Sequence, residues 1–248
     1  MKEIFFNKLN SGLPALGVSL DTDQLEKLYR YYELVIEKNK VMNLTAITEV
    51  GEFADKHIID SLSIVRAGST VTELLNKDSR VLDLGTGAGL PGMVLKIAFP
   101  DIRICLADSL RKRIDFLNEC IAELGLTGVD TVHGRAEDLG HDPKYREKFD
   151  LTVSRAVADM RVLSEYCLPF SKLNGYFCAY KSGDSKEEIA SADKAFKVLG
   201  GSVFSQSEFV LPGTDMGRNI VIVKKVRSTP GKYPRKAGTP HKEPIGNA

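Results

Sequence analysis

The chain has 248 residues, with 34 lysines and arginines against 33 aspartates and glutamates. Hydrophobic residues make up 43% and charged residues 27%, which is typical of globular domains and excludes a wholly disordered chain. No apolar stretch approaches the roughly 20 residues of a membrane helix, and the N-terminus lacks a signal-peptide pattern, so we expect a cytoplasmic protein. The four cysteines form no CxxC pair, and we expect neither disulfides nor a metal site.

The N-terminal part of the chain is predicted to form a small helical cap. Over residues 23–40 apolar side chains recur every three or four positions, which predicts a helix with one buried face. Asp21 or Thr22 can cap this helix. A similar pattern over residues 49–67 places His57 on its inward face.

From residue 80 onward, short apolar runs alternate with helical patterns. This alternation predicts a parallel sheet with helices on both faces. The last two strands follow each other directly, which predicts an antiparallel hairpin. The predicted strands are 81–82, 102–107, 129–132, 151–153, 175–180, 202–210 and 219–226, and the predicted helices are 91–99, 110–124, 158–168 and 185–199. This α/β outline is that of the methyltransferase variant of the doubly wound, Rossmann-like fold, although the outline alone is only suggestive.

A glycine-rich segment follows the first predicted strand. Residues 81–92 read VLDLGTGAGLPG, with Gly85, Gly87 and Gly89 at alternate positions. Glycines allow a tight turn and let a ligand approach the backbone, and Pro91 can begin the next helix. The same letters match the dinucleotide fingerprint GxGxxG, which alone is weak evidence.

Two acids at strand ends help to choose the ligand. Asp83 precedes the glycines, where its charge opposes a pyrophosphate but favours the ammonium and sulfonium groups of S-adenosylmethionine. Asp108 ends the next strand, where a carboxylate accepts the ribose hydroxyl protons of either ligand. Either acid can instead be only a helix cap. An NAD-binding dehydrogenase and a non-catalytic RNA-binding protein therefore stay open as alternatives.

Polar residues also follow the third and fourth strands. Ala136 and Glu137 come where a backbone and a carboxylate can reach an adenine edge, although short acidic loops are usually only solvated. Arg155 ends the fourth strand, at the edge where open α/β sheets bind ligands. The Asn-Pro-Pro-Tyr sequence of many enzymes that methylate exocyclic amines is absent here. A ring nitrogen, an oxygen or another atom therefore stays open as the target.

The C-terminal end of the chain is basic. Residues 224–248 hold seven lysines and arginines against one acid, so they carry +6 and the rest of the chain −5. Four prolines and three glycines exclude a continuous helix or a central strand, and we expect an extended arm. Phosphate contacts with base stacking and a merely solvated tail are equally compatible with this composition. The candidate RNA contacts are Lys181, at the end of the fifth strand, and Arg227, Lys232, Tyr233, Arg235 and Lys236.

Together these motifs resemble those of the bacterial 16S rRNA guanine-N7 methyltransferases, the RsmG or glucose-inhibited division protein B family. The resemblance covers almost the whole chain, and the order and spacing of the motifs make it specific. The motifs are NLT at 43–45, HIIDS at 57–61, DLGTGAGLPG at 83–92, DSLxKR at 108–113, RAE at 135–137, SRA at 154–156 and YPRKxGTP at 233–240.

The resemblance implies an S-adenosylmethionine-dependent enzyme that methylates N7 of guanine 527 in the 530 loop of 16S rRNA, in the small ribosomal subunit. The cofactor contacts that it implies are Gly85, Leu90, Asp108, Ser109, Leu110, Ala136, Glu137 and Arg155, to which the glycine loop adds Asp83, Gly87 and Gly89. The expected organisation is a cap over 1–70, a methyltransferase domain over 71–227 and a basic arm over 228–248.

Methylation of guanine N7 needs no general base, because N7 carries a lone pair and no proton. Holding the reacting atoms in line then supplies most of the rate enhancement. A carboxylate can stabilise the positive charge that develops on the purine, and Asp60 and Asp159 are candidates. Arg155 can donate to guanine O6, and His57 can stack on the base or can be only a core residue. The target base must lie in a loop or be flipped out.

Overall fold

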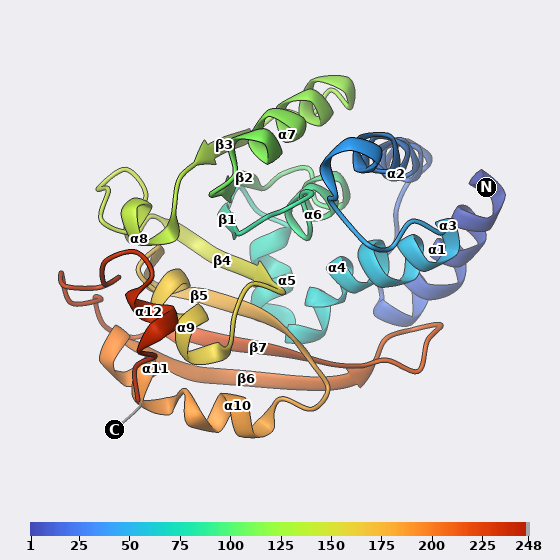
Figure 1. Ribbon diagram of the computed structural model, residues 1–248. Helices are drawn as coiled ribbons and strands as arrows, with labels where there is room; N and C mark the ends of the chain where they lie inside the picture. The colour runs from blue at the N-terminus through green and yellow to red at the C-terminus, as the bar shows by residue number, and fades with distance from the viewer. Residues whose placement is uncertain (247–248) are drawn as a thin grey trace.

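In the computed structural model, which describes residues 1–246, a seven-stranded sheet forms the centre of the protein (Figure 1). Its strand order is β3-β2-β1-β4-β5-β7-β6, and β7 runs antiparallel to both of its neighbours. The strands are β1 (Arg80–Leu84), β2 (Arg103–Asp108), β3 (Val129–His133), β4 (Phe149–Arg155), β5 (Ser171–Ser182), β6 (Gly201–Val210) and β7 (Gly217–Lys225). The predicted sheet with its terminal hairpin is confirmed.

The central strands are apolar on both faces because helices cover both. Along β1, Val81 contributes to one cluster of buried side chains and Leu82 to another, on the opposite face. In β2, Leu106 and Cys105 divide between the two clusters in the same way. Such continuous apolar runs are typical of strands buried on both sides.

The N-terminal helices cover one face of the sheet and the later helices cover the other (Figure 1). The first face carries α1 (Lys2–Leu16), α2 (Thr22–Met42), α3 (Val50–Phe53), a π-helical turn (Ala54–Ile59), α4 (Asp60–Leu62), a 3-10 turn (Ser63–Ala67), α5 (Ser69–Leu75), α6 (Gly92–Ala98) and α7 (Arg111–Glu123). The second carries α8 (Ala136–Leu139), α9 (Met160–Cys167), α10 (Lys186–Ser191), α11 (Asp193–Leu199) and α12 (Thr239–Lys242). None of the helices within residues 1–246 combines the length and apolar character needed to span a bilayer.

The cap helices form for reasons that the sequence partly shows. Asp21 caps α2 by accepting a hydrogen bond from the Gln24 backbone N–H at 2.8 Å, and the Gln24 side chain accepts from the Asp21 N–H in return. Helix α1 was not predicted, because Gly12 and Pro14 interrupt its apolar pattern. A β-carbon at Gly12 would lie 2.4 Å from the Ile59 side chain, so glycine lets the two segments approach closely.

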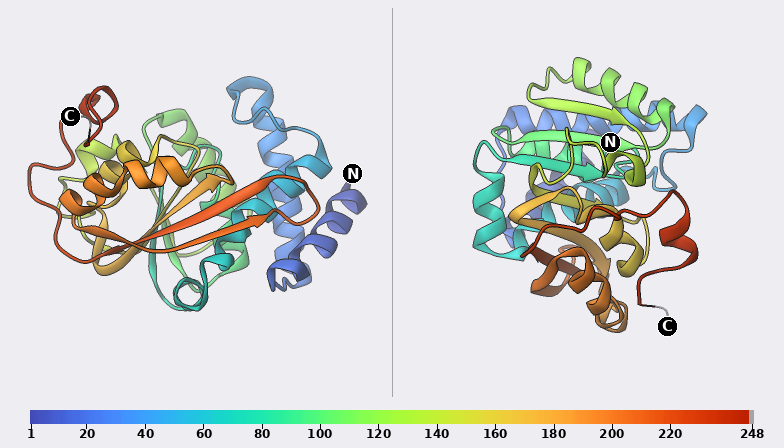
Figure 2. Two further views of the ribbon diagram at one scale, coloured as in Figure 1. Left: turned by 90° about the horizontal axis from the view of Figure 1, so that it is seen from below. Right: turned by 90° about the vertical axis from the view of Figure 1, so that its left-hand side faces the viewer.

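The expectation of an extended C-terminal arm was wrong. Residues 228–246 turn back, and the one-turn helix α12 lies against α9 (Figure 2). Pro234, Pro240 and Ile245 are buried there. The apolar surface of these residues stabilises a docked path that net charge alone does not reveal. The last two residues of the predicted arm, 247 and 248, lie outside the described residues.

Candidate active site

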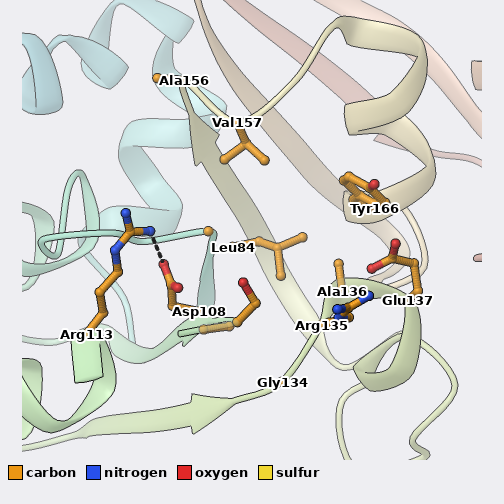
Figure 3. Close-up of a pocket in the computed structure, with 13 residues that line it drawn as sticks. Leu84, Asp108, Arg113, Gly134, Arg135, Ala136, Glu137, Ala156, Val157 and Tyr166 are labelled. Carbon is orange, nitrogen blue, oxygen red and sulfur yellow. Dashed lines mark hydrogen bonds and ion pairs between the residues drawn. The ribbon is translucent and has the colours of Figure 1, made fainter. Parts of the chain in front are cut away.

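A cavity of about 470 Å³ opens at the carboxyl edge of the central strands (Figure 3). Parallel strands of an open sheet end at one edge, so the turns after β1, β2, β3 and β4 meet there. The cavity is lined by five of the predicted cofactor residues: Gly85, Asp108, Ser109, Ala136 and Glu137. It is not lined by Gly87, Gly89, Leu90 or Leu110, which lie in the same turns. Arg113, which ends the DSLxKR motif, and Val157 and Tyr166 also line it, and none of the three was predicted as a site residue.

The glycine loop turns as predicted. Gly85, Gly87 and Gly89 have φ values of 74°, 61° and 106°, a region of backbone conformation that residues other than glycine rarely adopt. The loop is held from the cap, because the Tyr31 hydroxyl of α2 donates to the Ala88 carbonyl at 2.7 Å. This buried contact ties α2 to the glycine loop, and no sequence motif pointed to it.

Asp108 joins two turns of the cavity wall. Its Oδ2 accepts from the Gly87 N–H at 3.0 Å and from Arg113 Nη1 at 3.2 Å. Its Oδ1 accepts from the Leu110 N–H at 2.9 Å. The carboxylate is thus fixed at the end of β2, where the sequence placed the acceptor for a ribose.

Asp83 lies behind the glycine loop rather than in the cavity. Its Oδ2 accepts from Thr86 Oγ1 at 2.6 Å and from the N–H of Gly92, the first residue of α6, at 2.8 Å. Complete burial raises its pKa to about 6. Asp83 thus does not line the first cavity, where a ligand cation was expected to meet it, and the alternative of a helix cap describes its contacts.

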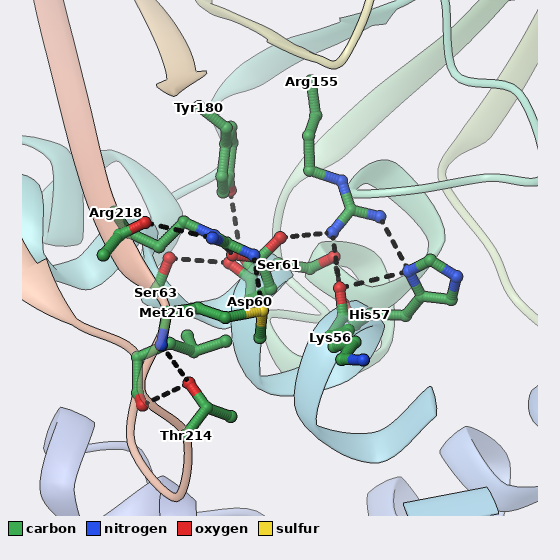
Figure 4. Close-up of polar contacts among 12 residues, drawn as sticks. Lys56, His57, Asp60, Ser61, Ser63, Arg155, Tyr180, Thr214, Met216 and Arg218 are labelled. Atoms are coloured by element: carbon green, nitrogen blue, oxygen red, sulfur yellow. Dashed lines mark hydrogen bonds and ion pairs between the residues drawn. The ribbon is translucent and has the colours of Figure 1, made fainter. Parts of the chain in front are cut away.

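A second cavity, of about 420 Å³, adjoins the first, and Figure 4 shows several of its residues with their polar contacts. Ala156, the residue after β4, lines both cavities and has a φ of 57°, which is uncommon for a residue with a side chain. Such strained backbone is often found at functional sites. Four basic and two acidic residues line the second cavity: Lys56, Arg155, Lys181, Arg218, Asp60 and Glu188.

Two arginines hold Asp60 in the second cavity. Arg155 Nη1 donates to Oδ2 and Arg218 Nε donates to Oδ1, each at 2.7 Å. All three side chains are largely buried. Arg155 thus lies in the second cavity, not in the first as its predicted cofactor role required. The charges of two arginines offset that of Asp60, which leaves little negative charge to stabilise a purine cation.

His57 lines the second cavity from the π-helical turn. Its Nε2 lies 2.8 Å from Thr45 Oγ1, and its Nδ1 lies 3.4 Å from Arg155 Nη2. Burial and then the positive charge of Arg155 lower the pKa of His57 to about 4. His57 is therefore neutral near pH 7, and it combines core packing against Phe53 with a place at the cavity.

This lowered pKa predicts a pH dependence of stability. Below pH 6.5 the unfolded chain protonates His57 and the folded protein does not, so stability is lost as the pH falls from 6.5 toward 4. By linkage the loss attributable to His57 between pH 7 and pH 5 is about 2 kcal/mol. Urea unfolding at both pH values is expected to show this difference between the wild type and His57→Gln. Equal pH slopes in the two proteins would contradict it.

Four other candidates are engaged within the protein. Lys181 Nζ donates to Glu188 Oε1 at 2.6 Å and to the Ala158 carbonyl at 2.8 Å. Asp159 caps α9 by accepting from the Arg161 and Val162 N–H groups and lines neither cavity, so its position does not support the predicted catalytic role. Two arginines of the basic stretch 224–248 also have internal acceptors: Arg227 donates to the Lys197 carbonyl, and Arg235 pairs with Glu165. Lys232 and Lys236 are exposed, with Lys232 Nζ over the Tyr233 ring.

Arg218 is the main site residue that the sequence did not reveal. It lies at the start of β7, opposite Ser182 of β5. Because β7 is antiparallel, its amino end meets the carboxyl edge of the parallel strands. In the sequence Arg218 is visible only as a charged residue at the start of the last hairpin strand. Its place at the site can be inferred only when the strand order is known.

Comparison with known proteins agrees with this architecture. Residues 24–215 match the family model GidB, described as rRNA small subunit methyltransferase G. The chain is 49% identical over 237 residues to ribosomal RNA small subunit methyltransferase G of Alkaliphilus oremlandii, covering 96% of this chain and 97% of that protein. It is 47% identical over 245 residues to the protein of that name from Acetivibrio thermocellus, covering 98% of each.

Solved structures share the fold at low sequence identity. The cyclase SpnF superposes with a TM-score of 0.54 at 16% identity, covering 87% of this chain and 98% of that chain. MtNAS in complex with MTA and tNA superposes with a TM-score of 0.52 at 15% identity, covering 80% and 72%. By its family model and its relatives, the chain belongs to the rRNA small subunit methyltransferase G family.

Proposed function

We propose that the protein transfers a methyl group from S-adenosylmethionine to N7 of guanine 527 in 16S rRNA. The observation that carries the proposal is the pair of cavities that adjoin at Ala156, one beside a glycine loop and a strand-end carboxylate, the other lined by arginines. The names of the relatives support rRNA of the small subunit as the substrate. The base and its atom rest on the resemblance of the sequence motifs to those of the guanine-N7 methyltransferases.

The first cavity fits the methyl donor. Its volume of about 470 Å³ lies within the roughly 300–1,000 Å³ of small-molecule sites. Asp108 offers carboxylate oxygens to the ribose hydroxyls, and the turn at Ala136 and Glu137 offers backbone and carboxylate groups to an adenine edge. Gly85 brings the backbone of the glycine loop to the cavity, where a β-carbon would lie 2.6 Å from the Val157 side chain. When bound, S-adenosylmethionine supplies an electrophilic methyl group on a sulfonium.

The second cavity is suited to a guanine of an RNA chain. Arg155 and Arg218 outweigh Asp60, and this positive balance favours a substrate that carries phosphates. Arg155 can donate to guanine O6 while leaving N7 free, since a contact that also gripped N7 would block the reaction. Asp60 then acts by orienting Arg155, and the proximity of the two cavities supplies the alignment.

The proposed substrate is tested by labelled methyl transfer to rRNA from cells that lack the enzyme. We expect one labelled position, at guanine 527, and loss of the signal when rRNA from wild-type cells is used. Naked rRNA and intact small subunits are compared side by side. Label at another base, or on another atom of guanine 527, would refute the assignment.

The proposed cofactor is tested by calorimetry. Titration with S-adenosylmethionine is expected to give saturable binding, whereas NAD is expected to give none. Binding of NAD without binding of S-adenosylmethionine would reverse the assignment of the first cavity.

A further inference from the structure

The C-terminal segment, residues 228–246, is anchored to the catalytic fold at its start. Lys225, at the end of β7, is fully buried, and its Nζ donates to the Leu168 carbonyl and to Thr229 Oγ1, both at 2.6 Å. The N–H of Thr229 donates to Glu147 Oε1 at 2.8 Å. Arg146 donates to the Thr229 and Tyr233 carbonyls at 2.7 and 2.8 Å. The segment therefore leaves the sheet along a fixed path.

The middle of the segment is held by a buried carboxylate. Glu165 of α9 is fully buried, and its two oxygens accept from Arg235 Nε at 2.9 Å and from Nη2 at 2.7 Å. The Arg235 N–H also donates to Glu165 at 2.7 Å. A buried carboxylate without this partner would be strongly unfavourable, so the docked position is specified rather than incidental.

Three residues beyond Arg235, the segment contacts a residue that lines the first cavity. The Gly238 N–H donates to Glu137 Oε1 at 3.0 Å, and Glu137 lines the cavity. Tyr166, which follows Glu165 on α9, lines the same end of the cavity (Figure 3). Burial and then the negative charge of Glu137 raise the pKa of Tyr166 to about 12. The segment thus contacts both short helices, α8 and α9, that carry this wall.

We infer that the C-terminal segment positions Glu137 and Tyr166 and thereby sets the affinity for S-adenosylmethionine. The inference rests on the proposed function of the first cavity. Gly238 and Arg235 are positioning residues, since they touch the wall and not the cavity. The basic residues that the sequence assigned to RNA serve this purpose in part, because Arg235 is already committed to Glu165.

The test uses a glycine whose geometry allows a small change. Gly238 has a φ of 84°, and a β-carbon there would meet no atom of the described residues within 4 Å. Gly238→Ala therefore strains the backbone that presents the N–H to Glu137 and introduces no clash. Gly17 at the end of α1, with a φ of 74° and equally open surroundings, provides the matched control Gly17→Ala.

Gly238→Ala is expected to raise the Kd and the KM for S-adenosylmethionine by about fivefold, given the usual cost of such strain. The kcat at saturating S-adenosylmethionine, the rRNA affinity and its salt dependence are expected to stay within about twofold of the wild type. In a Glu137→Ala background Gly238→Ala is expected to have no further effect on Kd, because the two changes break one contact.

Three results would overturn the inference. The first is equal S-adenosylmethionine affinity in Gly238→Ala and Gly17→Ala. The second is additivity of Gly238→Ala with Glu137→Ala. The third is unchanged cofactor affinity in Arg235→Ala together with weaker rRNA binding and a flatter salt dependence, which would make the segment an RNA-binding arm. Failure of the wild type to bind S-adenosylmethionine would instead refute the proposed cofactor, and the inference with it.

Discussion

Gly87→Asp is expected to raise the Kd for S-adenosylmethionine by at least about 30-fold, equivalent to ~2 kcal/mol. Gly87 does not line the first cavity, but its N–H donates to Asp108, which does. A carboxylate at position 87 therefore adds a second negative charge to the turn that holds the proposed ribose acceptor. Isothermal titration calorimetry measures the loss. Aspartate tolerates a φ of 61° better than most residues, so the fold is expected to survive.

Gly125→Asp is the matched control for this variant. Gly125 has a φ of 60°, and a β-carbon there would meet no atom of the described residues within 4 Å. Gly125 follows the C-terminal end of α7, whereas Asp108 precedes the N-terminal end of the same helix. The two variants are expected to have similar melting temperatures but very different cofactor affinity. Wild-type affinity in Gly87→Asp, or an equal loss in Gly125→Asp, would refute the placement of the ligand against the glycine loop.

Arg155→Ala is expected to lower the single-turnover rate of methyl transfer by more than about 100-fold, a typical effect of losing one preorganised hydrogen-bond donor. The Kd for S-adenosylmethionine is expected to stay within about threefold of the wild type, because Arg155 lies in the second cavity. Arg155→Lys is expected to recover little of the rate, since an ammonium cannot contact Asp60 and the base as the planar guanidinium does.

The control for the arginine is Arg103→Ala. Arg103 pairs with Asp78 at the amino end of β2, with 69% of its side chain exposed, so its removal is expected to leave the rate unchanged. A parallel rise in the Kd for S-adenosylmethionine in Arg155→Ala would place this arginine in cofactor binding after all. A rate near that of the wild type would remove it from the proposed guanine site.

Parts of the candidate site that depend on local sequence were predictable. The turn of Gly85, Gly87 and Gly89 follows from the backbone freedom of glycine and from its position after a strand. Asp108 lines the cavity because it ends the neighbouring parallel strand. The role of Asp83 was not predictable, since the same spacing allows a carboxylate to face either a ligand or the first N–H group of α6.

Asp60 shows why the charge of a residue does not by itself predict which group that residue contacts. Its carboxylate was expected to face a cation on the substrate, yet Arg155 and Arg218 occupy both of its oxygens. Arg218 lies 158 positions away in the sequence, and only the antiparallel insertion of β7 beside β5 brings it there. No local pattern contains that pairing.

The α/β architecture, the glycine turn and the family follow from the order of residues along the chain, because periodicity, glycine placement and motif spacing are local properties. Long-range packing decided the rest: the separation of two cavities at Ala156, the pairing of Asp60, and the docking of residues 228–246 on α8 and α9. A charged side chain pairs with whichever partner the fold brings within hydrogen-bond distance. Once both groups are buried, breaking the pair would leave an unpaired charge at a large cost in free energy. From the sequence Arg235 was a candidate RNA contact, whereas in the folded chain it pairs with the buried Glu165.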